Sequence, residues 1–143
     1  MKRFTYLWWA LAITILLGGA YLKSASAQTP AYTAPSTTAS VAINISTATT
    51  TKLITGITSR WVYITNFNVI AGGTGNIQLV YGTGTLCATG QTALTGAYNL
   101  TAQAGLVLGS GVAPNLVVPT GNDVCAITSA AVQMSGSIAY AQP

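Results

Sequence analysis

The sequence is poor in charge and lacks most of the side chains that perform acid–base chemistry. Only 4% of its 143 residues are charged, against about 25% in typical soluble domains. It contains no histidine, and Asp123 is its single acidic residue. General acid–base catalysis usually draws on His, Asp or Glu, so paired-carboxylate and Ser-His-Asp mechanisms are excluded. We therefore expect that the protein is not an enzyme.

The other ionisable and ligating groups offer little for catalysis, metals or cofactors. A Ser–Lys pair would have to use Lys52, but the neighbouring threonines and Leu53 do not resemble a nucleophile site, and a solvated strand residue is the simpler interpretation. Structural zinc needs four N or S ligands and calcium needs several carboxylates. Gly82-Thr83-Gly84 lacks the third glycine of a dinucleotide-binding motif. We expect no catalytic residues, no metal and no cofactor.

The formal charge of +4 does not indicate a nucleic-acid partner. Three of the five basic residues lie within the first 23 residues, and the rest of the chain carries only Lys52, Arg60 and Asp123. Binding to nucleic acid needs several clustered lysines or arginines to neutralise phosphates. Low net charge also removes the repulsion that keeps monomers apart. We expect the partners to be other copies of the chain or other surface or virion subunits.

The N-terminal segment predicts export. A positively charged start and an apolar run from Leu7 to Leu17 are followed by Ala25-Ser26-Ala27, small residues at the two positions that a signal peptidase reads. We predict a signal helix over residues 1–27. The alternative is an uncleaved anchor, since residues 4–22 are just long enough to span a bilayer. Either way the protein is expected in the periplasm, at the cell surface or outside the cell, with membrane contact through this segment only.

The exported part is expected to form a short arm and one all-β domain. Residues 28–38 (QTPAYTAPSTT) are rich in Pro, Ser and Thr without periodic apolar positions, which indicates a flexible arm. Over residues 39–143 we expect eight or so short strands separated by Gly-rich turns, the pattern of a single two-sheet β-sandwich or jelly roll.

Alternation of apolar and polar residues with period two carries the all-β prediction. In the last strand Gly136 occupies an inward position, so a bulge or a close backbone approach is expected there. The alternating sets are Val41, Ile43 and Ile45; Trp61, Tyr63, Phe67 and Val69; Ile77, Leu79 and Tyr81; and Val132, Met134, Ile138 and Tyr140.

Cys87 and Cys125 are the only cysteines, and both follow the export signal. An isolated pair in an oxidising compartment is most simply a disulfide. A redox motif would place the two cysteines two residues apart, and a zinc site would need further ligands. We predict a structural disulfide, for which the loop-entropy model gives about 4 kcal/mol.

Trp61 and Tyr63 are the candidate ligand-stacking residues. Their rings, with Phe67 in the same alternating set, could form a platform for the apolar face of a sugar. The alternative is core packing, because alternating aromatic residues on a sandwich strand usually point inward. Exposed coplanar rings would favour a carbohydrate-binding module, and buried rings would exclude it.

Four segments carry a resemblance to known proteins: residues 81–90 (YGTGTLCATG), 93–96 (ALTG), 119–125 (PTGNDVC) and 129–137 (SAAVQMSGS). With them, the chain from about Ala39 to Gln142 resembles small β-sandwich proteins encoded in phages and prophages of proteobacteria. The resemblance implies a virion or surface component and carries no catalytic motif. An export signal departs from ordinary virion proteins, which assemble in the cytoplasm.

A second resemblance, to chaperone–usher pilins, rests on the single cysteine pair and on the alternating stretch from Val132 to Tyr140. Pilins are exported sandwiches with one disulfide and a similar C-terminal strand. Their cysteines fall early in the mature chain, whereas Cys87 and Cys125 fall in its middle and late parts. The resemblance implies a fimbrial subunit whose arm adds as a strand to a neighbouring sheet edge.

The sequence thus predicts a non-catalytic, exported structural or adhesive β-sandwich subunit, at the cell surface or in a virion. A carbohydrate-binding module that uses Trp61 and Tyr63 is one alternative. A pilin-like fimbrial subunit is the other.

Overall fold

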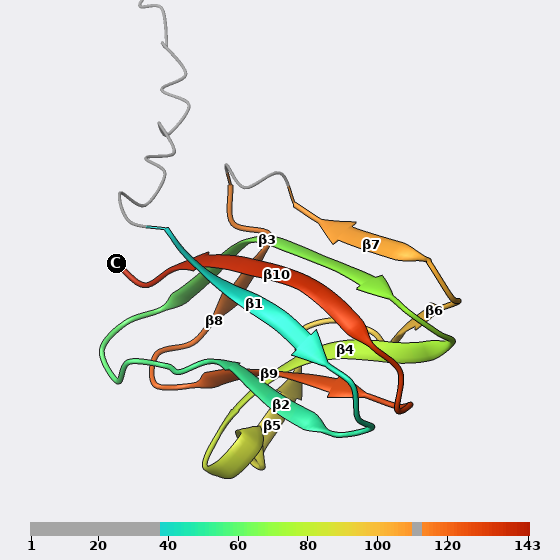
Figure 1. Cartoon of the computed structure of the whole chain (residues 1–143). Helices are drawn as coiled ribbons and strands as arrows, with labels where there is room; N and C mark the ends of the chain where they lie inside the picture. Colours follow the sequence, from blue (N-terminus) through green and yellow to red (C-terminus); the bar gives the residue numbers. More distant parts are fainter. Residues whose placement is uncertain (1–37, 110–112) are drawn as a thin grey trace, which may run out of the picture. The chain divides into compact units, whose positions relative to one another are not determined.

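The computed structural model describes residues 38–109 and 113–143, which contain ten β-strands and one short 3-10 helix (Figure 1). The all-β class predicted from the period-two pattern is confirmed. The expected signal segment, and the arm apart from Thr38, lie outside the described residues. Within the described part, no helix is long and apolar enough to cross a membrane.

The strands form two antiparallel five-stranded sheets that face each other across the core (Figure 1). Sheet A contains β1 (Ala39–Ile45), β10 (Met134–Ala141), β3 (Val62–Ala71), β7 (Gly105–Leu108) and β8 (Leu116–Val118). Sheet B contains β2 (Thr50–Ile54), β9 (Asp123–Thr128), β4 (Gly75–Thr83), β5 (Thr89–Ala93) and β6 (Tyr98–Leu100). The 3-10 helix η1 (Thr85–Cys87) lies between β4 and β5.

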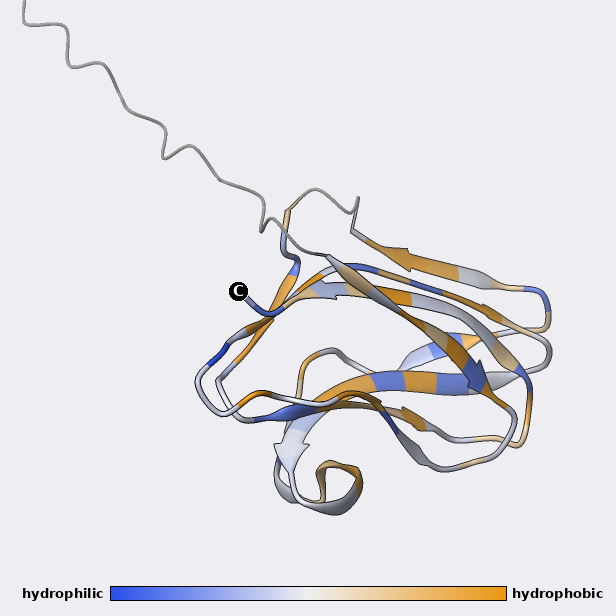
Figure 2. Cartoon of the chain, turned by 60° about the vertical axis from the view of Figure 1, so that its left-hand side comes forward, coloured by the Kyte–Doolittle hydropathy of each residue, from blue (hydrophilic) through white to orange (hydrophobic). Residues whose placement is uncertain are grey.

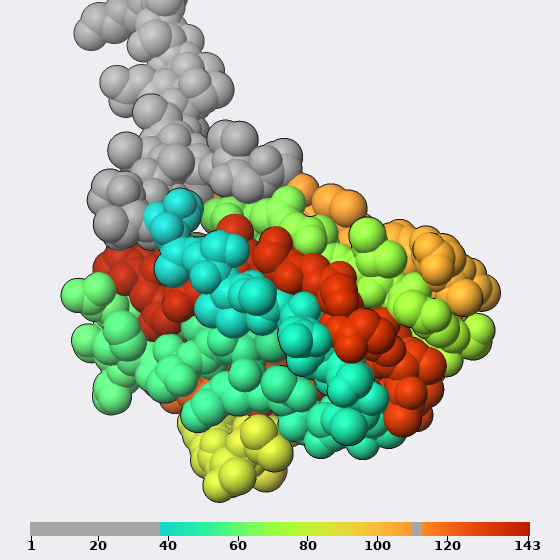
Figure 3. All heavy atoms as spheres, viewed as in Figure 1, coloured from blue at the N-terminus to red at the C-terminus, as the bar shows by residue number. Residues whose placement is uncertain are grey.

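The strand order, which the sequence left open, is that of a jelly roll. Strand β1 pairs with β10, β2 with β9, β3 with β7 and β8, and β4 with β5 and β6. The first half of the domain therefore pairs with the second half in reverse order, and successive strands of the first half alternate between the two sheets. Figure 3 shows the result for sheet A, where β1 runs along the front with β10 and then β3 behind it.

The core lies between the inner faces of the two sheets. Figure 2 shows hydrophobic and hydrophilic residues alternating along several of the longer strands, which contribute an apolar side to the interior. The large side chains that are almost fully buried include Val62, Ile64, Phe67, Val69, Met134 and Ile138 from sheet A, and Ile54, Ile77, Leu79 and Val124 from sheet B.

Strand β3 departs from the predicted alternation at Thr65. In the pairing with β10, Ile64 lies opposite Tyr140 and Asn66 lies opposite Ala139, so Thr65 has no opposite residue. The buried Thr65 hydroxyl instead donates a hydrogen bond of 3.3 Å to the carbonyl oxygen of Ala139. One extra residue of this kind is a β-bulge, and it reverses which side chains of the strand face the core.

The bulge separates two pairs of residues that the sequence placed on one face. Phe67 and Val69, after the bulge, are buried in the core, whereas Tyr63, before it, lies on the outer side of sheet A, and Trp61, directly before the strand, is exposed. The Trp61 side chain is 47% exposed and Tyr63 is half-buried. The expectation that these four residues share a face is therefore wrong, and so is the alternative that packs Trp61 in the core.

Gly136 lies in an unbroken stretch of the ladder, opposite Ile43 on one side and Val69 on the other. A Cβ at this position would overlap the carbonyl oxygen of Asn68 and lie 2.8 Å from the Cα of Val69. The close backbone approach expected at Gly136 is confirmed. The bulge lies elsewhere, at Thr65.

Candidate functional site

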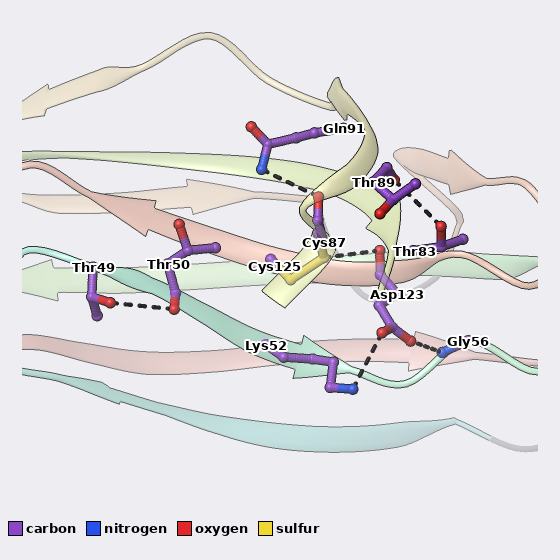
Figure 4. Close-up of a disulfide and its surroundings, with 10 residues drawn as sticks. All are labelled: Thr49, Thr50, Lys52, Gly56, Thr83, Cys87, Thr89, Gln91, Asp123 and Cys125. Atoms are coloured by element: carbon purple, nitrogen blue, oxygen red, sulfur yellow. Dashed lines mark hydrogen bonds and ion pairs between the residues drawn. A yellow bond between two sulfur atoms is a disulfide. The ribbon is translucent and has the colours of Figure 1, made fainter. Parts of the chain in front are cut away.

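Cys87 and Cys125 form the predicted disulfide, with their Sγ atoms 2.01 Å apart (Figure 4). Both residues are fully buried, but they do not belong to the main core. They pack with Val80 in a separate small cluster on the outer face of sheet B, against the half-buried Ile127. The bridge thus attaches the connection between β4 and β5 to the outside of the sandwich.

The connection that the disulfide holds has a strained backbone. Leu86 and Cys87 have φ angles of 53° and 58°, in the left-handed region that is unfavourable for residues other than glycine. Gly84, with a φ of 76°, supplies the first turn of the connection without this penalty. The Leu86 side chain is 42% exposed, so the stapled loop is a fixed protrusion with an apolar residue on its surface.

The contacts of Asp123 and Arg60 fix the two ends of the connection between β2 and β3, and Lys52 pairs with Asp123. Lys52 Nζ lies 3.2 Å from Asp123 Oδ2, and the backbone N–H of Gly56 donates to Asp123 Oδ1 at 2.9 Å (Figure 4). Arg60 Nη1 donates to the carbonyl oxygen of Gln142 at 2.9 Å. Lys52 is an exposed strand residue, as expected, and Asp123 opens β9. These contacts hold the connection against β9 and the C-terminal segment.

The described residues contain no group of three His, Cys, Asp or Glu side chains that could hold a metal ion. Among the surface grooves lined by the described residues, two have volumes of about 400 and 390 Å³. The first lies along β7 and β8 and is lined mainly by Leu94, Tyr98, Val107 and Leu116. The second is lined by Ile57 and by residues at one end of sheet A, where the start of β1 pairs with the end of β10. The side chains that line the two grooves are uncharged, so neither groove offers a charged group to a ligand.

Sheet A presents an outer face without a charged side chain, which we call the sheet A face. None of its five strands contains Asp, Glu, Lys or Arg. The register places the following side chains on this face: Ser40, Ala42, Asn44, Tyr63, Asn66, Asn68, Ile70, Val107, Val117, Ser135, Ser137 and Ala139.

The polar groups at the centre of the sheet A face bind one another. Asn68 Nδ2 donates to Asn66 Oδ1 at 3.0 Å and to Ser137 Oγ at 2.8 Å. The backbone N–H of Ser137 donates to Asn68 Oδ1 at 3.1 Å, and Asn66 Nδ2 donates to the carbonyl oxygen of Gly109 at 3.0 Å. With these hydrogen bonds made within the chain, burying this polar row under a partner would cost less than burying unpaired amides.

Exposed aliphatic side chains flank this polar row on both sides. Ile70 is 59% exposed and Val107 is 67% exposed; they are diagonal neighbours, because Val107 lies opposite Asn68. On the other side Val117, 43% exposed, lies opposite Tyr63, and Trp61 precedes the strand. Large exposed apolar side chains that gather on a neutral face are typical of contact surfaces.

Part of this surface was predicted from the sequence, and part of it was missed. Trp61 and Tyr63 were candidates, and the structure places Tyr63 at one end of the sheet A face and an exposed Trp61 directly before β3. Whether they stack on a sugar stays a prediction. Ile70, Val107 and Val117 were missed, although Val107 and Val117 each sit between two residues that face inward in a short strand, a period-two signal that could have identified them.

Neither a protein-family model nor a curated protein matches the sequence. Among solved structures, a chain of the T13 IBDV viral particle matches with a TM-score of 0.40 and 11% identity, over 76% of this chain and 31% of that one. The present chain therefore spans about a third of the length of the viral-particle chain. PirA matches with a TM-score of 0.36 and 11% identity, over 73% of this chain and 93% of its own. Both likenesses are too distant to assign a family, and neither indicates a function.

Proposed function

We propose that the protein is a non-catalytic structural or adhesive subunit, exported from the cytoplasm, which works by contact through the sheet A face. The observation that carries the proposal is the character of this face: five strands without a charged residue, a polar row that is hydrogen-bonded internally, and exposed Ile70, Val107 and Val117. Because the face has no charge, two like surfaces can approach each other without electrostatic repulsion.

The positions of the ionisable groups support a role without catalysis. Lys52 and Asp123 pair with each other, and Arg60 is bound to a backbone carbonyl. Asp123 also accepts the backbone N–H of Gly56, so Asp123 and Arg60 hold the β2–β3 connection in place, and each of these contacts can be explained by structure alone. A reaction centre would need a general base or nucleophile with access to a cleft.

The disulfide supports the proposed export. Disulfides persist in oxidising compartments such as the periplasm, the cell surface and the extracellular medium. The bond between Cys87 and Cys125 joins the connection between β4 and β5 to strand β9 on the outside of sheet B, so it stabilises the surface of the sandwich. The proposed partners are other copies of the chain or other subunits of a cell surface or a virion.

The test is assembly of the exported protein. The full chain is expressed in a bacterium, purified from the exported fraction and examined by sedimentation velocity over a wide concentration range. We expect assembly that grows with concentration in the wild type and that is strongly reduced in Ile70→Lys/Val107→Lys, which places two charges on the sheet A face. Thr92→Lys/Ala97→Lys, with two charges at exposed sites on the sheet B side, is the matched control and should assemble like the wild type. Equal loss in both variants, or a wild type that stays monomeric, would contradict the proposal.

A carbohydrate-binding module is the second candidate, and the exposure of Trp61 favours it. Trp61 lies directly before β3 and Tyr63 two positions further along, on the outer side of the strand, with Arg60 next to Trp61 in the sequence. Co-sedimentation with cellulose, chitin and peptidoglycan tests the idea, with Trp61→Ala as the variant and Ile70→Lys/Val107→Lys as the control. Binding that only Trp61→Ala removes would favour the carbohydrate function over assembly. The pilin-like alternative stays a prediction, because residues 28–37 of the arm lie outside the described residues.

A further inference from the structure

The two sheets of the sandwich have four edges, and three of them carry features that discourage pairing with another chain. A sheet edge presents unpaired backbone groups unless charge, a bulge or short strand length blocks it. At one edge of sheet B, strand β2 contains the charged Lys52, and its pairing with β9 has a register shift directly after this residue. At the other edge of sheet B, β5 also has a register shift and β6 has only three residues. The edge of sheet A opposite β1 is made of two short strands, β7 and β8, of four and three residues.

Strand β1, the fourth edge, has none of these features. It is seven residues long and pairs with β10 in unbroken register from Ala39 to Ile45. It contains no charged residue, no proline and no glycine. Figure 3 shows the atoms of β1 running across the front of the molecule, where this strand forms the edge of sheet A. A long, regular and uncharged edge of this kind is a template for a further strand.

We propose that β1 pairs with β1 of a second copy, antiparallel and centred on Ala42, so that the two A sheets become one continuous sheet across a dimer. In this register Val41 lies opposite Ile43 of the partner, and Ser40 lies opposite the partner's Asn44. Val41 and Ile43 both face the core side of sheet A, whereas Ser40 and Asn44 both face outward. The strand is therefore complementary to itself, with an aliphatic pair on one side and a polar pair on the other.

Three further observations point to a second copy as the occupant of this edge. The edge is neutral, so two identical strands meet without repulsion. Val41 is only half-buried in the single chain, and a β-branched neighbour would cover it; cross-strand pairs of this kind stabilise a sheet. The same strand serves on both copies, so the contact closes as a two-fold dimer and cannot continue as a fibre. The inference rests on the proposed function, because this dimer would be the unit that presents two sheet A faces to further partners.

The test uses Ile70→Lys/Val107→Lys as the background, since these charges block contact through the sheet A face and leave the β1 edge unchanged. Ala42→Lys is added to it, and Ala93→Lys is the matched control, because both alanines are exposed and lie in edge strands. At the centre of the proposed pairing the two introduced lysine charges, one from each copy, would lie directly opposite each other, which is unfavourable. We expect the background variant and the Ala93→Lys control to form a dimer, with a dissociation constant raised about tenfold or more by Ala42→Lys.

A cysteine in place of Ala42 tests the register. Directly opposite residues of an antiparallel pair have Cα atoms about 4.5–5.5 Å apart, within the range that a disulfide spans. Ala42→Cys should form a covalent dimer on export and Ala93→Cys should not, while the buried native bridge stays intact.

The outcomes separate the two proposals. A background variant that is monomeric, while the wild type assembles, overturns the β1 pairing and leaves the function through the sheet A face standing. An equal dimer in the Ala42→Lys and Ala93→Lys proteins, or a dimer without the Ala42→Cys cross-link, also overturns the pairing. A dimer that Ala42→Lys weakens and Ala42→Cys cross-links supports it, whatever the wild type does beyond the dimer.

Discussion

Removal of the disulfide by Cys87→Ala/Cys125→Ala is expected to lower the free energy of unfolding by about 2–4 kcal/mol. The two cysteines are 38 positions apart in the sequence, and the chain-entropy model gives about 4 kcal/mol for a closure of this length. The stabilisation arises mainly in the unfolded chain, because the bridge removes open conformations from it. The value is a large share of the roughly 5–15 kcal/mol that stabilises an ordinary domain.

Backbone strain in the stapled loop makes the net loss smaller than the entropic value. Leu86 and Cys87 have positive φ angles, each at a cost of about 1–2 kcal/mol for a residue other than glycine. Without the bridge the loop can relax, but β4 and β5 still hold its two ends. We therefore expect about 1–2 kcal/mol of this strain to be recovered in total.

Urea unfolding followed by circular dichroism measures the loss, and hydrogen exchange shows where it acts. Because the bridge packs with Val80 outside the main core, exchange should rise first at residues 84–90, while β3 and β10 stay protected. Wild-type protein whose bridge has been reduced is the control, since it keeps both sulfur atoms and should lose a similar amount. A decrease in the free energy of unfolding of less than about 1 kcal/mol would refute the reasoning. So would hydrogen exchange that rises in both sheets at once in the absence of urea.

Three further experiments test the close approach at Gly136, the bulge in β3 and the ion pair of Asp123. Gly136→Ala should lower the free energy of unfolding by about 3 kcal/mol or more, because the added Cβ would overlap backbone atoms. Gly96→Ala is the control and should change it little, because no atom lies within 4 Å of the added Cβ. Thermal melts of both variants measure the difference. Phe67→Ala should cost about 3–5 kcal/mol and Tyr63→Ala clearly less, if the bulge places them on opposite faces; equal losses in urea unfolding would contradict that placement. Asp123→Asn should cost less than about 1 kcal/mol, because its ion pair is partly exposed and Oδ1 can still accept the hydrogen bond at the backbone; a loss above about 2 kcal/mol would show that the charge matters more than the geometry indicates.

Local patterns were enough to predict the fold class, the disulfide and the close approach at Gly136. Alternation with period two and Gly-rich turns depend on neighbouring residues alone, and they located the main strands. The cysteine pair needed no geometry, since the chain offers one pairing only. An inward position without a side chain, as at Gly136, is a signal that the sequence itself contains.

The bulge at Thr65 could not be predicted, because it depends on the register with β10. Nothing in the types of Thr65 and Asn66 sets them apart from other strand residues. The extra residue is evident only in the pairing with β10, where Ile64 and Asn66 lie opposite the consecutive residues Tyr140 and Ala139. This one residue decides that Tyr63 faces outward while Phe67 and Val69 face the core. Long-range pairing likewise places the disulfide outside the core and leaves β1 as the unblocked edge.

Sedimentation velocity of the exported wild-type protein, beside Ile70→Lys/Val107→Lys, tests the central claim most directly. If the neutral outer surface of sheet A is what the protein uses, the wild type will form larger species as its concentration rises, and the doubly charged variant will not grow beyond a dimer. A wild type that sediments as a monomer at every concentration up to its solubility limit would contradict the account.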